Sequence, residues 1–142
     1  MKVKDIMTKN VITVKPETTL KELAKIIKTH RINGVPVVDE GDTLVGIVTM
    51  TDMLKILRDI YYWAEIEKAK PGLGVKDALI EEKNNATVQT KMTTGVYTVS
   101  EEESVEDVVE IMCKRNIHTI PVVKEKKLIG VIGATDIVNI FV

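Results

Sequence analysis

The chain has little of several residue types that carry chemistry in proteins. Its only cysteine is Cys113, so no disulfide can form within the chain. Two histidines accompany it, which is too few for a Cys/His site, and we expect no metal. The apolar runs are only a few residues long, and no secretory signal follows Met1. These absences predict a cytoplasmic protein without redox or metal chemistry.

An excess of charge of either sign is also missing. The 142 residues include 20 lysines and arginines against 21 aspartates and glutamates, for a net charge of −1. A polybasic nucleic-acid or membrane-surface binder is therefore not the default interpretation, and no nucleic-acid-binding motif is present. A chain of this length buries about two thirds of its unfolded surface, so it needs no metal or disulfide to fold.

The sequence does contain the same pattern twice. A shift of 85 residues superimposes a Met-Thr pair, a Thr-Val pair and a Pro-Val-Val run, and a one-residue deletion near Asp42 then makes the shift 84. Two copies are too few for a solenoid, so we predict two small α/β units related by a pseudo-twofold axis, neither of them stable alone. The matched residues are Met7-Thr8 with Met92-Thr93, Thr13-Val14 with Thr98-Val99, Pro36-Val37-Val38 with Pro121-Val122-Val123, Gly46 with Gly130, and Asp52 with Asp136.

Each copy has the pattern β-α-β-β-α. A β-branched run comes first, and a capping box then begins a helix, at Thr19 in the first copy and at Ser104 in the second. A strand follows whose proline excludes a central, fully paired position. The second helices begin near Asp52 and Asp136. The predicted strands are 11–14, 35–38 and 44–48 in the first copy and 96–99, 120–123 and 128–132 in the second.

Between the copies lies a segment of different composition. We predict one long helix from Asp52 to about Lys70, a stop at 71–74, and a short helix over 75–82. The chain then divides into a first repeat at 1–57, a helical linker at 58–87 and a second repeat at 88–142.

Two apolar groups indicate a partner. Adjacent helical residues point in different directions, so one core cannot bury Tyr61, Tyr62 and Trp63 together. Partial exposure of amphipathic rings is the alternative, but we favour a homodimer interface through helices that include these three residues. The second group is the C-terminal run Ile137, Val138, Ile140, Phe141 and Val142.

These motifs resemble the CBS domain, which is named after cystathionine β-synthase, and two copies in tandem resemble a Bateman module. The residues that carry the resemblance in the first copy are Val3, Met7-Thr8, Thr13-Val14, Ile32, Val35 to Asp39 and Gly46 to Asp52. The resemblance implies an α+β fold of two pseudo-twofold-related β-α-β-β-α units packed sheet to sheet. It also implies two clefts that bind adenosyl ligands such as AMP, ADP, ATP, S-adenosylmethionine or NAD derivatives.

The resemblance assigns candidate residues to each cleft. Asp52 lies where a strand ends and a helix begins, and its carboxylate would accept two ribose hydroxyls while free amides attract a phosphate. The alternative is that Asp52 only caps the helix. Gly133 stands where the first copy has Thr49, so the second cleft lacks that hydroxyl. The first predicted cleft comprises Ile12, Thr13, Val14, Pro36, Thr49 and Asp52, and the second Tyr97, Thr98, Val99, Pro121 and Asp136.

Phosphate groups need cations, and the chain has only three arginines. Arg31 and Arg115 fall in equivalent loops, with His30 and His118 in the same two loops, and these four residues are the candidate phosphate contacts. Compensation of a helix dipole is the alternative role for such cations. Among the apolar candidates, which could equally be sheet core, Tyr97 stands out because its ring could stack on a base.

The predicted function is regulatory sensing of an adenine nucleotide or other adenosyl ligand, with action on a separate protein because no catalytic domain is attached. No cofactor is required beyond this regulatory ligand. The alternative is a ligand-free dimerisation module. We do not expect an enzyme, because no nucleophile or metal accompanies His118 and Asp136.

Overall fold

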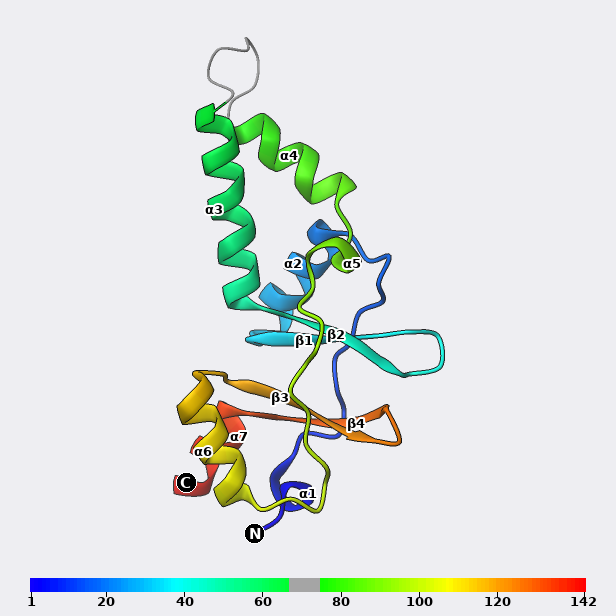
Figure 1. Ribbon diagram of the computed structural model, residues 1–142, viewed down its shortest axis with the longest axis vertical. Coiled ribbons are helices and arrows are strands. Elements are labelled where there is room, and N and C mark those ends of the chain that lie inside the picture. Colours follow the sequence, from blue (N-terminus) through cyan, green and yellow to red (C-terminus); the bar gives the residue numbers. More distant parts are fainter. Residues whose placement is uncertain (67–74) are drawn as a thin grey trace.

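The computed structural model describes residues 1–66 and 75–142 of the chain (Figure 1). The helices and strands are α1 (Val3–Ile6), α2 (Leu20–His30), β1 (Gly34–Val38), β2 (Leu44–Thr49), α3 (Met50–Ile66), α4 (Val75–Asn85), α5 (Val88–Lys91), α6 (Val105–Arg115), β3 (Thr119–Lys124), β4 (Lys127–Gly133), α7 (Ala134–Val138) and the 3-10 helix η1 (Asn139–Phe141). The predicted helix over 75–82 therefore continues to Asn85. The last predicted residues of the long helix, from Glu67 to Lys70, lie outside the described residues.

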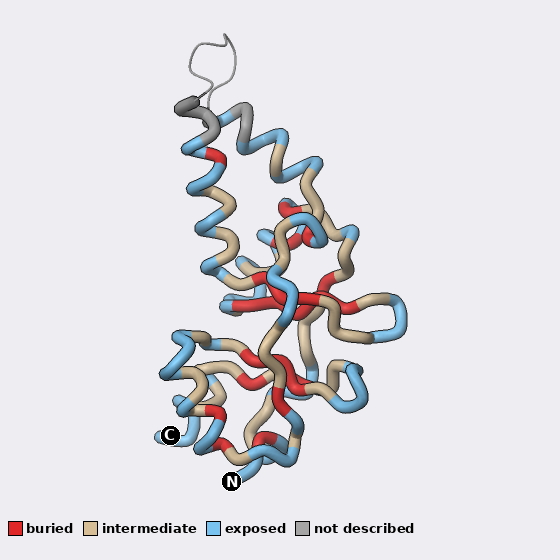
Figure 2. The backbone as a smooth tube through the Cα atoms, in the orientation of Figure 1, coloured by how far each residue is buried: buried red, intermediate tan, exposed pale blue. Residues whose placement is uncertain are grey.

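Two antiparallel hairpins face each other at the centre of the molecule, and helices cover their outer sides (Figure 1). β1 pairs with β2 in the first half, and β3 pairs with β4 in the second. Buried residues concentrate in these strands (Figure 2). The sheets approach closely, since a β-carbon at Gly34 would lie 3.3 Å from the Thr119 side chain. This arrangement confirms the predicted α+β class, with two repeats packed sheet to sheet.

Helices α2 and α6 occupy equivalent places in the two repeats, and each begins at its predicted N-cap residue. The Thr19 hydroxyl accepts from the amide of Glu22 at 3.2 Å, and the Glu22 carboxylate accepts from the amide of Thr19 at 3.1 Å. Ser104 accepts from the amide of Asp107 at 3.1 Å, but the Asp107 carboxylate makes no return bond to the Ser104 amide, so the capping box predicted there is only half formed. Both caps satisfy amide groups that a helix leaves without an internal partner, and they fix where α2 and α6 start.

The runs 11–14 and 96–99, predicted as strands, contribute only one bridging residue each. Val14 pairs in parallel with Val37, because its amide donates to Pro36 at 3.1 Å and its carbonyl accepts from Val38 at 3.0 Å. Extending this ladder by two residues would require an N–H at Pro36, which proline lacks. Val99 and Pro121 repeat the arrangement in the second half. Because Pro36 and Pro121 lack this N–H, the residues before Val14 and before Val99 do not join the sheet.

Each half contributes its first segment to the other half. Val3 of α1 is fully buried among Val99, Val108 and other core residues of the second half. Val88 of α5 is likewise buried in the core of the first half, beside Leu23. The segments that follow these helices also exchange. Each core therefore includes a buried residue from the other repeat, and the instability of a single copy stays a prediction.

The exchanged segments pair with the central strands. Thr93 and Ile47 exchange two backbone hydrogen bonds, at 2.9 and 3.0 Å, and Thr8 and Val131 do the same at 2.8 and 2.9 Å. In both strands a glycine precedes the residue that makes these bonds, Gly46 before Ile47 and Gly130 before Val131. A β-carbon at Gly46 would lie 2.5 Å from Sδ of Met92 and 3.0 Å from the carbonyl oxygen of Thr93. The repeated glycine therefore permits this close crossing of the two halves.

Candidate functional site

Asp52 is the third residue of α3, and its carboxylate caps the start of that helix. Its Oδ2 accepts from the amide of Thr49 at 2.9 Å and from the Thr49 hydroxyl at 3.1 Å. In return, the Asp52 amide donates to the Thr49 hydroxyl at 3.2 Å. The capping role that the sequence left open is therefore real. It occupies one carboxylate oxygen and holds the side chain in a defined position.

The other carboxylate oxygen of Asp52 faces the second half. The Thr93 hydroxyl donates to Oδ1 at 3.0 Å. Thr93 belongs to the exchanged segment after α5, so this bond crosses from one repeat to the other. An ionised carboxylate offers about four acceptor positions, and three of them are used here. Asp52 retains capacity for a ligand hydroxyl at Oδ1.

A cavity of about 810 Å³ lies beside this carboxylate. A volume of this size is within the usual range for small-molecule sites. Its walls come from the β2–α3 junction of the first half and from two segments of the second half, 93–98 and 115–119. The lining residues are Asn33, Ile47, Thr49, Met50, Thr51, Asp52, Lys55, Thr93, Gly95, Val96, Tyr97, Thr98, Arg115, Asn116, Ile117, His118 and Thr119.

The cavity brings together residues that the sequence assigned to different clefts. Thr49 and Asp52 come from the first predicted set, and they face Tyr97 and Thr98 from the second set. The remaining members of the first set, Ile12, Thr13, Val14 and Pro36, do not line this cavity. Val14 and Pro36 are buried in the sheet instead. The cleft is thus built across the repeats, because the exchanged segments carry one repeat's residues to the other's helix.

Cations lie on the same wall as the aromatic ring. The Arg115 guanidinium stacks over Tyr97, with Cζ 5.0 Å from the ring centroid, and both residues line the cavity. His118 lines the cavity as well, so two of the four predicted phosphate contacts meet Asp52. Lys55, one turn after Asp52 on α3, adds a cation that the sequence analysis missed. Lys55 follows Asp52 by three residues on a predicted helix, so this spacing could have indicated that both side chains lie on the same face.

The second carboxylate repeats this geometry with one difference. Asp136 accepts from the amide of Gly133 at 2.8 Å and from the Thr8 hydroxyl at 2.9 Å. Gly133 supplies no hydroxyl, so the two hydrogen bonds between the Thr49 hydroxyl and Asp52 have no counterpart here. By the repeat offset, His30 is the counterpart of Arg115, and the structure places these two residues at the ends of α2 and α6 rather than in the predicted loops. Arg31, which ends α2 with a φ of 52°, corresponds to Asn116.

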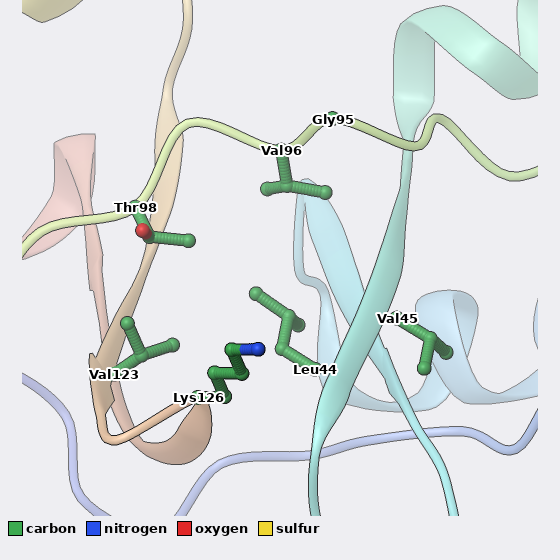
Figure 3. Close-up of a pocket in the computed structure, with 7 residues that line it drawn as sticks. All are labelled: Leu44, Val45, Gly95, Val96, Thr98, Val123 and Lys126. Carbon is green, nitrogen blue, oxygen red and sulfur yellow. The ribbon is translucent and has the colours of Figure 1, made fainter.

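A smaller groove adjoins the main cavity. Its volume is about 230 Å³, and it shares Gly95, Val96 and Thr98 with the larger space. Figure 3 shows the side chains of Leu44 and Val96 pointing toward one another, with the Lys126 ammonium directed toward Leu44. The residues around the groove are Leu44, Val45, Gly95, Val96, Thr98, Val123 and Lys126. The result is an apolar space with one cation at its edge.

Two α/β repeats with exchanged segments around a shared cavity define a tandem-repeat module. A family model for the CBS domain matches the chain twice, over residues 3–59 and 87–142. The chain belongs to the CBS domain family, and it contains a tandem pair of these domains. This result confirms the resemblance noted in the sequence.

Three similar proteins illustrate the family. The L-aspartate semialdehyde sulfurtransferase of Methanocaldococcus jannaschii is 34% identical over 140 residues, which are 98% of this chain and 23% of that protein. The chain therefore spans about a quarter of this curated relative. The CBS domain pair of protein MJ0100, in complex with 5′-methylthioadenosine and S-adenosyl-L-methionine, superimposes with a TM-score of 0.72 at 33% identity, covering 99% of this chain and 95% of that one. The structure of CBSX2 in complex with AMP superimposes with a TM-score of 0.76 at 26% identity, and the match covers 99% of this chain and 95% of that one.

Membrane insertion through a helix has no support among residues 1–66 and 75–142, where every helix is too short or too polar to cross a bilayer. The same residues contain no cluster of three or more side chains suited to hold a metal ion.

Proposed function

We propose that this tandem CBS pair binds an adenosyl ligand, such as AMP, ADP or ATP, in the cavity beside Asp52. The observation that carries the proposal is the cross-repeat setting of Asp52. One of its oxygens is anchored by the cap at Thr49, and the other faces a cavity large enough for a nucleotide. The remaining acceptor position at Oδ1 suits one of the vicinal hydroxyls of a ribose. The adenosyl ligands of the MJ0100 and CBSX2 structures support this class of ligand.

The remaining parts of a nucleotide find matching chemistry in the same place. Arg115, His118 and Lys55 offer positive or titratable groups to phosphate oxygens. The adenine ring would lie against Tyr97 and extend toward the apolar groove at Leu44 and Val96 (Figure 3). A flat aromatic base is of a size and polarity that such a groove accommodates.

The proposed second site is the pseudo-symmetric counterpart around Asp136. By the repeat offset, Ile12, Thr13, His30 and Arg31 would line its walls, opposite Asp136. The assignment of Val99 and Pro121 to a ligand site has less support, because both side chains are buried in the sheet.

Binding in a cleft built from both repeats would link their relative position to the ligand. We propose that a separate partner protein reads this change, which makes the chain a regulatory module without chemistry of its own. The enzyme-named relative is about four times as long as the matched region, so its activity is not transferred to this chain.

The first test is a thermal-shift titration with AMP, ADP, ATP and S-adenosylmethionine. A ligand that binds only the folded state raises the melting temperature, by an amount that grows with its concentration above Kd. Asp52→Ala should remove most of the shift. Asp59→Ala is the matched control, because it removes an exposed carboxylate from the same helix α3. No shift with any adenosyl compound at millimolar concentration argues against the proposal.

Homodimerisation is the second candidate function, and exposed apolar side chains favour it. Leu54 is 66% exposed, Tyr61 53% and Tyr62 69%, while Phe141 is 88% exposed. Soluble proteins rarely leave such a group of side chains uncovered. The predicted role of Trp63 stays a prediction, since its side chain lies outside the described residues. Sedimentation at several protein concentrations should reveal a dimer that Tyr62→Ala weakens.

A further inference from the structure

The turn between β3 and β4 holds two residues in the left-handed backbone region. Glu125 has a φ of 52° and Lys126 a φ of 70°, while Lys124 and Lys127 pair on either side of them. Such a two-residue turn favours Asn-Gly or Gly-Gly, because a long side chain is strained at a positive φ. Backbone strain of this kind is concentrated at functional sites. A lysine at this position therefore indicates a role for its side chain.

The Lys126 side chain lines the smaller groove, next to the main cavity. Its ammonium is directed toward Leu44 (Figure 3), and the Lys126 carbonyl accepts from the Leu44 amide at 3.1 Å. This backbone bond joins the two hairpins and fixes the turn. Within residues 1–66 and 75–142, Lys126 forms no ion pair. The turn thus presents a cation with free donors to a groove whose other side chains, apart from Thr98, are apolar.

Asp42 occupies the equivalent place in the turn of the first hairpin. The repeat offset of 84 residues superimposes it on Lys126. Its φ is 62°, and its carbonyl accepts from the amide of Leu128 at 3.1 Å, so the backbone geometry is the same. The Asp42 carboxylate forms no ion pair with the described part of the chain, and the ammonium of Lys15 donates to the carbonyl of Asp39 instead, at 2.9 Å. The two halves therefore carry opposite charges at corresponding places.

These charges lie where the base of a bound nucleotide would be. The groove at Lys126 adjoins the cavity at Asp52, and by the repeat symmetry Asp42 belongs to the cleft at Asp136. A nucleotide with its ribose at the aspartate would direct the six-membered ring of the purine, the end farthest from the sugar, into the groove. An ammonium only donates, so it suits O6 of a 6-oxopurine or N1 of adenine. A carboxylate only accepts, so it suits the N6 amino group of adenine.

We propose that Lys126 and Asp42 determine which purine each cleft accepts. The inference rests on the nucleotide binding proposed above and specifies the base. The cleft at Asp52 accepts a 6-oxopurine nucleotide such as IMP as well as AMP, because the Lys126 ammonium donates to O6 or to N1. The cleft at Asp136 accepts AMP and disfavours IMP, because the Asp42 carboxylate would face O6 and two acceptors repel one another. One chain then responds to two kinds of purine nucleotide through separate clefts.

Isothermal titration with AMP and with IMP tests the assignment. The wild type should bind AMP in both clefts and IMP in one, which the stoichiometry reports. Lys126→Asp should lower the affinity for IMP about tenfold, the size expected for loss of one charge-assisted hydrogen bond, and should change AMP binding much less. Aspartate tolerates a positive φ, so the turn is kept. Lys124→Asp is the matched control, because it makes the same change of charge at an exposed position of the same hairpin outside the groove.

Two further variants separate the role in binding from the backbone strain. Lys126→Gly relieves the strain, so its urea midpoint should rise while its affinity for IMP falls about tenfold. Asp42→Lys should create a second cleft for IMP, since the same backbone geometry already holds a lysine at position 126. No binding of IMP by a wild type that binds AMP, or unchanged IMP affinity in both Lys126 variants, would overturn this inference alone. Binding of neither nucleotide would overturn the function proposed above as well.

Discussion

The hydroxyl of Thr93 donates to Oδ1 of Asp52 at 3.0 Å, across the boundary between the two repeats. We expect this bond to hold the carboxylate in the orientation that a ribose requires. Thr93→Val keeps the shape of the side chain and removes the donor, so adenosyl affinity should fall about three- to tenfold in isothermal titration. The preference for AMP over 2′-deoxyAMP should fall with it.

Two further variants separate positioning from general stability. Thr93→Ser retains the hydroxyl and should restore affinity. Thr8→Val removes the equivalent bond to Asp136 at 2.9 Å and should leave the site at Asp52 unchanged. If the folded Thr93→Val variant binds AMP as tightly as the wild type, or more tightly, the positioning role of Thr93 is contradicted.

Gly46 is required by the close crossing of the repeats. Gly46→Ala should lower the free energy of unfolding by about 1–3 kcal/mol, because the backbone carbonyl of Thr93 cannot move away without breaking its pairing with Ile47. Gly133→Ala is the control, since its β-carbon would find its nearest neighbour at an ordinary 3.6 Å. Urea denaturation measures both. Equal effects from the two substitutions would show that the crossing is not the cause.

Acid should weaken the attachment of the N-terminus. The Glu102 carboxylate accepts from Lys2 at 2.7 Å and from Lys4 at 3.0 Å. The hydrogen bond from Lys2, followed by that from Lys4, lowers the pKa of Glu102 from 4.5 to about 2. A carboxyl whose pKa is lower in the folded state stabilises the protein above its unfolded pKa. This contribution is therefore present above about pH 4.5 and is lost as the pH falls toward 2.

Glu102→Gln tests this dependence. Its urea midpoint should lie below that of the wild type at pH 6 and should converge with it as the pH approaches 2. Both side chains of each pair are largely exposed, so the difference should also shrink in high salt. A difference that is constant from pH 6 to pH 2 would assign the effect to packing.

The repeat made most of the fold predictable. Thr19 with Glu22, and Ser104 with Asp107, start their helices where the capping pattern indicates, because a cap is a local interaction. Pro36 was expected to exclude a central, fully paired position for its strand, and β1 is indeed fully paired only with β2, with a single bridge to Val14 on its other side. The effect of Pro36 on the neighbouring run at 11–14 was not foreseen, since the partner of the missing N–H lies more than twenty residues away.

The composition of the cavity was less predictable. The family resemblance grouped Asp52 with Ile12 and Thr13, which precede it in the same repeat. The structure instead places Tyr97 opposite Asp52, since the segment after α5 crosses to the first half. An internal offset identifies equivalent residues, but it does not say which copy's segment pairs with which sheet. The pairing follows from the packing of the two short helices, since Val3 is buried in the core of the second half and Val88 in the core of the first.

The most direct test of the account is a crystal structure of the chain with AMP. We predict a ribose hydroxyl within hydrogen-bonding distance of Oδ1 of Asp52, about 2.5–3.0 Å, with the phosphate toward Arg115 and His118. A nucleotide bound with its sugar away from both Asp52 and Asp136, or no nucleotide at saturating concentration, would contradict the account.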